Sequence, residues 1–114
     1  MIQVYGIKNC NKIRDTLQWL KEKEVEYIFF DLKKEPLTRE ELDEFVYRIG
    51  LDVLVNRRGT TWRNLGLSES ELPDDELTNL LFENQSMIKR PVLVRDEAMI
   101  VGYDEDAFEE FISD

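Results

Sequence analysis

The fold of this chain is decided by residues 2–32, IQVYGIKNCNKIRDTLQWLKEKEVEYIFFDL. Residues 2–5 alternate apolar and polar side chains, a pattern typical of a short strand. Residues 27–32 are rich in aromatic and β-branched side chains and predict a second strand. Residues 11–23, between them, carry apolar side chains at helical spacing. These apolar residues are Ile13, Leu17 and Leu20. Because a strand, a helix and a strand in succession form a βαβ unit, we expect the two strands to be parallel neighbours.

A second helix is predicted to begin after Thr38 and to end at Gly50. Thr38 and Glu41 have the spacing of a capping box, in which each side chain satisfies a free backbone N–H group at the start of a helix. Apolar residues at helical spacing predict the buried stripe of this helix. They are Leu42, Phe45, Val46 and Ile49. Glycine is a residue at which helices commonly end.

The last part of the chain predicts a helix, a hairpin and a closing helix. Residues 74–82 begin with acidic side chains and then direct Leu77, Leu80 and Leu81 inward. Two apolar runs, residues 92–95 and 99–101, are separated by a tight connection and predict an antiparallel hairpin. Asp104 can cap the closing helix. The apolar face of that helix consists of Ala107, Phe108, Phe111 and Ile112.

The order of elements is therefore β-α-β, a helical middle, and β-β-α. This order matches the thioredoxin-like class of α/β folds, with a four-stranded mixed sheet in a three-layer α/β/α arrangement and a helical insertion between strands two and three. We expect a single domain over residues 1–114, with the insertion at roughly residues 37–86.

The composition excludes several classes of function. The chain has 25 acidic and 15 basic residues and a net charge of −10, which argues against a nucleic acid or a membrane as a direct partner. It has no histidine, so histidine acid–base catalysis and the usual zinc sites are excluded, and we expect no metal. One cysteine permits no internal disulfide, and residues 1–5 do not begin a secretion signal. We therefore expect a cytoplasmic protein.

Cys10, the only cysteine, falls between the first predicted strand and the first predicted helix. The first N–H groups of a helix have no helical partner and carry partial positive charge, so a thiolate at this position is stabilised relative to the thiol. Lys8 and Lys12 flank the cysteine and either add favourable charge or point into water. The alternative is that Cys10 is a buried packing residue. Ile13 stands where a Cys-X-X-Cys motif has its second cysteine, so any turnover needs an external thiol.

Three motifs follow one another along the chain: YGIKNC at residues 5–10, NRRGTTWR at residues 56–63 and IKRP at residues 88–91. Together they closely resemble the ArsC-like family of arsenate reductases and their relatives. The resemblance runs from Ile2 to Ile112 and is strongest to the YffB branch, with the Spx regulators as a neighbouring branch. It implies a thioredoxin-like domain with a helical insertion.

The resemblance also implies roles for residues in these motifs. Cys10 corresponds to the catalytic nucleophile, and Arg90 to the arginine that binds the oxyanion or steadies the thiolate. Pro91 corresponds to the cis-proline that faces the cysteine in thioredoxin-like folds.

Four further residues are candidates for binding an anion. Arg58 fits the second family arginine, with the adjacent Arg57 as the alternative, and either arginine can also be a solvated loop charge. Lys8 and Asn9, beside the cysteine, complete this set.

From the helix-start cysteine, the missing second thiol and the resemblance, we expect a glutathione-dependent monothiol reductase related to arsenate reductases, acting on an oxidised small substrate or a mixed disulfide. No bound cofactor is expected; glutathione is the co-substrate, and glutathione or a glutaredoxin-type protein is the partner. Residues 101–103, VGY, replace a third arginine of the arsenate reductases, which removes a charge-assisted partner worth about 1.5–3 kcal/mol.

One alternative is an Spx-like transcriptional regulator that binds RNA polymerase without catalysis, although Ile13 removes the usual Cys-X-X-Cys switch. Another is a scaffold in which Cys10 is inert.

Overall fold

The computed structural model describes residues 1–66 and 72–113; residues 67–71, within the predicted insertion, lie outside this part. The chain divides into two compact units. The first unit consists of Met1–Glu35 and Arg90–Asp114, and the second consists of Pro36–Lys89. No helix in the described part of the chain is long and apolar enough to cross a membrane.

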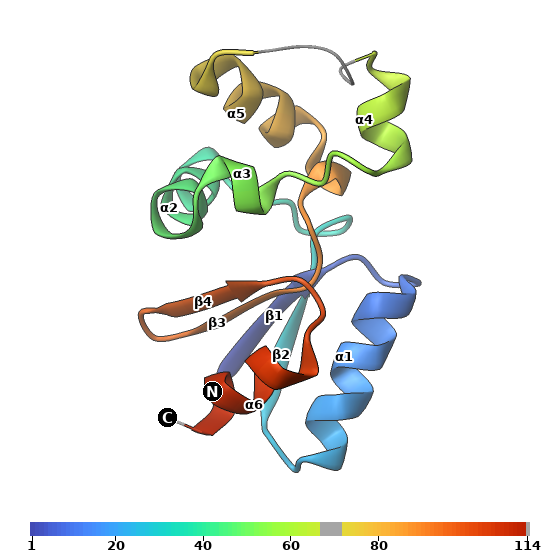
Figure 1. Cartoon of the computed structure of the whole chain (residues 1–114), viewed down its shortest axis with the longest axis vertical. Helices are drawn as coiled ribbons and strands as arrows, with labels where there is room; N and C mark the ends of the chain where they lie inside the picture. The colour runs from blue at the N-terminus through green and yellow to red at the C-terminus, as the bar shows by residue number, and fades with distance from the viewer. Residues whose placement is uncertain (67–71, 114) are drawn as a thin grey trace. The chain divides into compact units, whose positions relative to one another are not determined.

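A four-stranded mixed sheet forms the centre of the first unit (Figure 1). Its strands are β1 (Ile2–Gly6), β2 (Tyr27–Asp31), β3 (Val92–Arg95) and β4 (Ala98–Val101), in the order β2-β1-β3-β4. The β1–β2 pair is parallel, whereas the β1–β3 and β3–β4 pairs are antiparallel. The predicted βαβ unit and hairpin are therefore confirmed, and no strand end differs from its predicted position by more than one residue.

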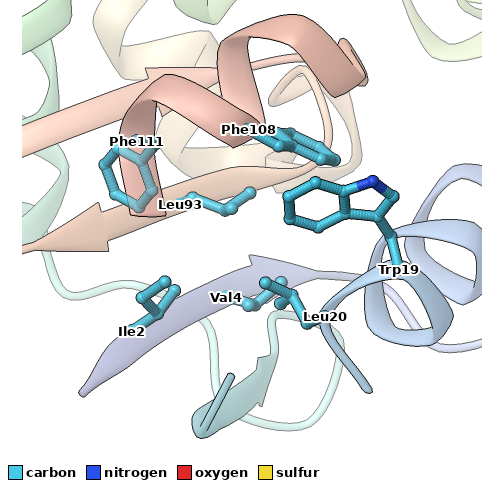
Figure 2. Close-up of a cluster of buried hydrophobic side chains, with 7 residues drawn as sticks. All are labelled: Ile2, Val4, Trp19, Leu20, Leu93, Phe108 and Phe111. Carbon is cyan, nitrogen blue, oxygen red and sulfur yellow. The ribbon is translucent and has the colours of Figure 1, made fainter. Parts of the chain in front are cut away.

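Two helices, α1 (Asn11–Glu22) and α6 (Glu105–Ser113), cover one face of this sheet (Figure 1). Figure 2 shows the core between them, where side chains from β1, β3 and both helices meet. These residues are Ile2, Val4, Trp19, Leu20, Leu93, Phe108 and Phe111. The rings of Trp19 and Phe108 pack edge to face with their centroids 5.3 Å apart. Such a pair contributes about 0.5–1.5 kcal/mol beyond the apolar area that it buries.

The buried face of α1 is wider than the sequence predicted. Ile13 and Leu20 are buried as expected, but Leu17 is only half-buried. Trp19 and Thr16 are buried as well. The Thr16 hydroxyl donates a hydrogen bond to the carbonyl oxygen of Lys12 at 2.6 Å, so its burial leaves no unsatisfied polar group.

The closing helix begins after Asp104, as predicted. The Oδ1 atom of Asp104 accepts hydrogen bonds from the N–H groups of Asp106 at 3.0 Å and Ala107 at 3.3 Å. This cap satisfies two backbone donors that have no partner within the helix. Phe108 and Phe111, on the predicted apolar face, are buried in the core.

The second unit contains short helices and one isolated bridge. Its elements are α2 (Arg39–Ile49), α3 (Leu51–Leu54), α4 (Thr60–Asn64), α5 (Asp74–Glu83), the 3-10 helix η1 (Gln85–Met87) and the bridge between Val55 and Ile88. The predicted capping box of α2 is present. The Thr38 hydroxyl accepts from the Glu41 N–H group at 3.1 Å, and the Glu41 carboxylate accepts from the Thr38 N–H group at 2.9 Å. The helices α3 and α4 were not predicted, because four or five residues are too few to show a helical period.

The buried stripe of α2 is narrower than predicted, and that of α5 is shifted, because Thr78 is buried there and Leu80 is not. Leu42 and Phe45 of α2 and Leu77 and Leu81 of α5 are buried. The other predicted residues are only half-buried; they are Val46, Ile49 and Leu80. Periodicity identifies the inward side of a helix, but the width of the buried stripe depends on how much surface the neighbouring elements cover.

Gly6, the last residue of β1, allows this strand to approach α1 closely. A Cβ atom at Gly6 would lie 2.0 Å from Cδ1 and 2.7 Å from Cγ1 of Ile13. The carbonyl oxygen of Gly6 also accepts a hydrogen bond from the N–H group of Leu32 at 2.8 Å, just beyond β2. The end of β1 and the first turn of α1 therefore meet at a point where no side chain fits between them.

We expect Gly6→Ala to lower the free energy of unfolding by about 1–3 kcal/mol, because the added methyl group overpacks this contact. Denaturant unfolding measures the change. In an Ile13→Val background the Cδ1 atom is absent, so Gly6→Ala should cost less there. An equal cost in both backgrounds would contradict the role assigned to this contact.

Candidate active site

Cys10 is the N-cap residue of α1. Its backbone is extended, with φ −103° and ψ 131°, and its carbonyl oxygen accepts a hydrogen bond from the N–H group of Arg14 at 2.9 Å. The thiol is free and makes no capping hydrogen bond, and the residue is half-buried. The N–H groups before Arg14 have no partner within the helix, so Cys10 lies at the positive end of α1.

Asn9 turns the chain into this helix. Its φ angle of 72° lies in the left-handed region, which asparagine adopts more readily than most residues. The short loop between Gly6 and Cys10 thus has the close contact of Gly6 with Ile13 at one end and Asn9, a residue in the left-handed region, at the other.

A surface pocket of about 600 Å³ lies along α1 and beside β2, within the first unit. The loop before α1 contributes Lys8, Asn9 and Cys10 to its lining. The helix contributes Ile13, Arg14, Leu17, Gln18 and Lys21, and the segment from β2 onward contributes Phe29, Asp31 and Lys34. The structure thus brings three residues predicted for the site to one pocket, together with others that the sequence analysis did not select.

The residues that the sequence analysis missed give this pocket its charge. With Lys8, the cations Arg14, Lys21 and Lys34 outnumber the single lining carboxylate, that of Asp31. Arg14 and Lys21 could have been found from the sequence, because residues 10, 14, 17 and 21 follow one face of a helix and so lie on the same side as Cys10. No sequence pattern places Lys34 and Asp31 at the site, since only the pairing of β2 with β1 brings them beside α1.

Arg90 and Pro91 lie at the end of the sheet where the loop to Cys10 begins. In the antiparallel β1–β3 pair, Tyr5 is opposite Val92, so the start of β3 is next to the end of β1. The Arg90–Pro91 peptide bond is cis, and the Pro91 carbonyl oxygen accepts a hydrogen bond from the Gly102 N–H group at 2.9 Å. Arg90 is half-buried, and neither it nor Pro91 lines the pocket.

Arg57 and Arg58 belong to the second unit, where their environments differ. The Arg57 guanidinium lies over the ring of the buried Trp62, 5.4 Å from its centroid, and 3.7 Å from Oδ1 of Asp52. Both arginines are exposed, and the backbone N–H group of Arg58 donates to Oδ1 of Asn56 at 3.1 Å. Arg57 therefore has a packing role, whereas the Arg58 side chain has no hydrogen-bond or ion-pair partner among the described residues.

Two raised pKa values belong to groups that contact carboxylates of α6. Nζ of Lys23 lies 2.7 Å from Oε1 of Glu109, and this hydrogen bond raises the pKa of Lys23. The Tyr103 hydroxyl donates to Oε2 of Glu105 at 2.5 Å, which together with burial raises the pKa of Tyr103 to about 12. Neither group lines the pocket.

The described residues contain no group of three or more histidine, cysteine, aspartate or glutamate side chains able to hold a metal ion. The pocket itself places a thiol beside cationic side chains and an apolar surface. This combination suits a nucleophilic sulfur that reacts with an anionic partner.

Comparisons with known proteins agree with this description. The model of the ArsC family matches residues 5–111. A protein of Haemophilus influenzae is 36% identical over 110 residues, which cover 96% of this chain and 96% of that protein. A global transcriptional regulator Spx of Listeria innocua is 27% identical over 114 residues, which cover 98% of this chain and 87% of the regulator.

Two solved structures share both the fold and sequence similarity. A YffB protein superposes with a TM-score of 0.88 at 34% identity, covering 96% of this chain and 97% of that protein. An arsenate reductase (ArsC) related protein from Brucella melitensis superposes with a TM-score of 0.80 at 36% identity, covering 97% of this chain and 93% of its own.

The mixed sheet, with a cysteine at the turn from its first strand to its first helix, defines a thioredoxin-like protein whose site has one cysteine. The chain belongs to the ArsC family.

We expect Arg57→Ala to lower the free energy of unfolding by about 0.5–1 kcal/mol, because it removes the guanidinium from Trp62 and Asp52. Arg58→Ala should change it by less than about 0.5 kcal/mol, since an exposed side chain without a partner contributes little. Denaturant unfolding compares the two variants. A larger loss for Arg58→Ala would show that the packing roles of the two arginines have been reversed.

Proposed function

We propose that this protein is a glutathione-dependent monothiol reductase that uses Cys10 as its nucleophile and works in the cytoplasm. The observation that carries the proposal is the position of Cys10 as the half-buried N-cap of α1, on the wall of a pocket whose charged lining residues are four cations and one carboxylate. Membership of the ArsC family, with structural neighbours related to arsenate reductase, supports the same class of reaction.

The first step of the proposed cycle is an attack on a mixed disulfide between glutathione and a substrate thiol. The Cys10 thiolate attacks the glutathione sulfur, a Cys10–glutathione disulfide forms, and the substrate sulfur leaves as a thiolate that takes a proton from water. The unpartnered N–H groups in the first turn of α1 stabilise negative charge on the attacking sulfur before the reaction.

A second glutathione completes the cycle. Its thiolate attacks the glutathione sulfur of the mixed disulfide, which releases glutathione disulfide and restores the Cys10 thiolate. In the net reaction the thiol of the second glutathione is oxidised into glutathione disulfide, and the substrate sulfur is reduced to a thiol; the first glutathione sulfur stays in a disulfide throughout. An external thiol is needed because Ile13, which is 2% exposed and packs against the end of β1, stands where a dithiol motif has its second cysteine.

By analogy with the family, Arg90 and Arg58 assist this chemistry by stabilising negative charge on the reacting group. Arg90 precedes the cis-proline at the sheet end from which the Cys10 loop departs, and this position supports its role. The side chain of Arg58 makes no competing contact among the described residues, which favours it over Arg57 as the second arginine. Lys8 and Asn9 adjoin the thiol in the pocket lining.

A disulfide substrate is favoured over arsenate because of residues 101–103. β4 ends at Val101, and the next two residues, Gly102 and Tyr103, supply no cation. The Tyr103 hydroxyl is engaged by Glu105. A multiply charged oxyanion would therefore lack one charge-assisted partner, whereas a disulfide sulfur does not need it.

We expect wild-type protein mixed with glutathione disulfide to gain the mass of one glutathione, and Cys10→Ser to gain none, because only the thiol forms this bond. In a coupled assay with glutathione and a glutathionylated peptide, Cys10→Ser should fall to the uncatalysed background. Thermal unfolding of Cys10→Ser confirms that the variant folds. A wild-type protein that forms no mixed disulfide, or equal turnover by both proteins, would refute the proposal.

The alternative function is a transcriptional regulator that binds RNA polymerase without catalysis. The specific observation in its favour is the match to regulators named Spx, which cover 98% of this chain. Such a role does not require a reactive thiol, so the two functions differ in their dependence on Cys10.

For the regulator, we expect immobilised protein to retain purified RNA polymerase, and Cys10→Ser to retain the same amount, because docking depends on surface contacts and not on a covalent bond. Quantitative pull-down at physiological salt measures this retention. An unrelated acidic protein of similar charge serves as the control. No retention above that control would exclude this alternative.

A further inference from the structure

We propose that the pocket along α1 is the recognition site for the charged ends of a small peptide thiol with the chemistry of glutathione, and that Arg14, Lys21, Lys34 and Asp31 determine its specificity. This inference rests on the proposed function and adds the residues that select the thiol partner. It is carried by the charge, shape and size of the pocket.

The charge of the pocket is opposite to that of the whole chain. The protein has a net charge of −10, yet Lys8, Arg14, Lys21 and Lys34 line one pocket with a single carboxylate. None of these four cations forms an ion pair within the part of the chain that the structure describes. Four like charges in one pocket repel one another unless an anion joins them, so the pocket favours a ligand with more than one negative group.

The length of the pocket suits a tripeptide. Cys10 and Lys21, at its two ends along the helix, are separated by about 16 Å of helix axis. Helical side chains tilt toward the N-terminus, so those of Arg14 and Lys21 lean back toward Cys10. An extended tripeptide spans roughly 10 Å and the thiol of glutathione is on its central residue, so a sulfur at Cys10 leaves a terminal carboxylate about half that span away, toward the cations that lean back along the helix. The volume of about 600 Å³ is within the usual range for a pocket that holds a small ligand.

The remaining lining residues match the rest of such a ligand. Ile13, Leu17 and Phe29 supply an apolar surface against which methylene groups can pack. Asp31 is half-buried, and its Oδ1 atom accepts a hydrogen bond from the N–H group of Lys33 at 3.0 Å. A fixed carboxylate among cations suits the free ammonium group of a glutamyl residue. Glutathione carries two carboxylates, one ammonium group and one thiol, which correspond to these features.

S-methylglutathione is the probe for this site, because its thioether cannot form a disulfide. Titrated at low salt into isotope-labelled wild-type protein, it should shift the backbone amide signals of residues around Cys10, Arg14 and Lys21 saturably. Lys21→Gln and Lys34→Gln should each weaken binding about two- to fivefold, as expected for exposed charge pairs. Raising the salt concentration should weaken binding to wild type.

Lys33→Gln is the matched control, since Lys33 adjoins Lys34 but does not line the pocket. This variant should bind S-methylglutathione with the affinity of the wild-type protein. Asp31→Asn keeps an oxygen for the Lys33 N–H group and removes the charge. It should weaken binding of S-methylglutathione but not of its N-acetyl derivative, which has no ammonium group. Equal affinity for all the variants, or no saturable shifts at this pocket, would overturn the inference.

Reaction with the neutral hydroxyethyl disulfide separates this inference from the proposed function. If Cys10 forms a mixed disulfide with it while S-methylglutathione does not bind the pocket, the pocket assignment is wrong and the thiol chemistry stands. If S-methylglutathione binds with the expected charge dependence while Cys10 reacts with no disulfide, the pocket assignment stands and the reductase proposal is wrong.

Discussion

The contact between Gly6 and Ile13 is the constraint on which the site depends. With no side chain at Gly6, the end of β1 lies directly against the first turn of α1, and Leu32 fixes the same strand end through its hydrogen bond. The core formed by α1, α6 and the sheet holds the helix in place at its other end. Cys10 is consequently held at the helix start by two anchored elements, and the short loop before it has little freedom.

The distribution of charge gives this position its chemical character. Dissolved salt screens the charge of an acidic protein beyond about 10 Å, so a local cluster of cations can dominate the potential within its own pocket. The α1 pocket is such a place, since its cations are not neutralised by carboxylates of the described residues. A net charge of −10 is thus compatible with a small anion bound at one site.

The two adjacent arginines of the second unit illustrate why a motif does not assign roles to its residues. Arg57 and Arg58 are residues of the same type at adjacent positions of one motif. In the structure both side chains are exposed, but only the Arg57 guanidinium lies over the ring of Trp62. Packing therefore separates a structural arginine from one that remains able to bind a ligand.

The sequence by itself determined the order of elements, the parallel βαβ unit, the hairpin, the caps at Thr38 and Asp104, and the place of Cys10 before the first helix. Each of these features arises from a local pattern that lies within its own segment of the sequence. Only the tertiary structure decided the burial of Thr16, the narrow stripe of α2, and the pocket that joins Arg14 and Lys21 to Asp31 and Lys34. The burial of Thr16 and the pocket depend on which surfaces meet when β2 pairs with β1 beside α1, and the stripe of α2 depends on its neighbours within the second unit. A residue's neighbours across such contacts leave no trace in its own segment.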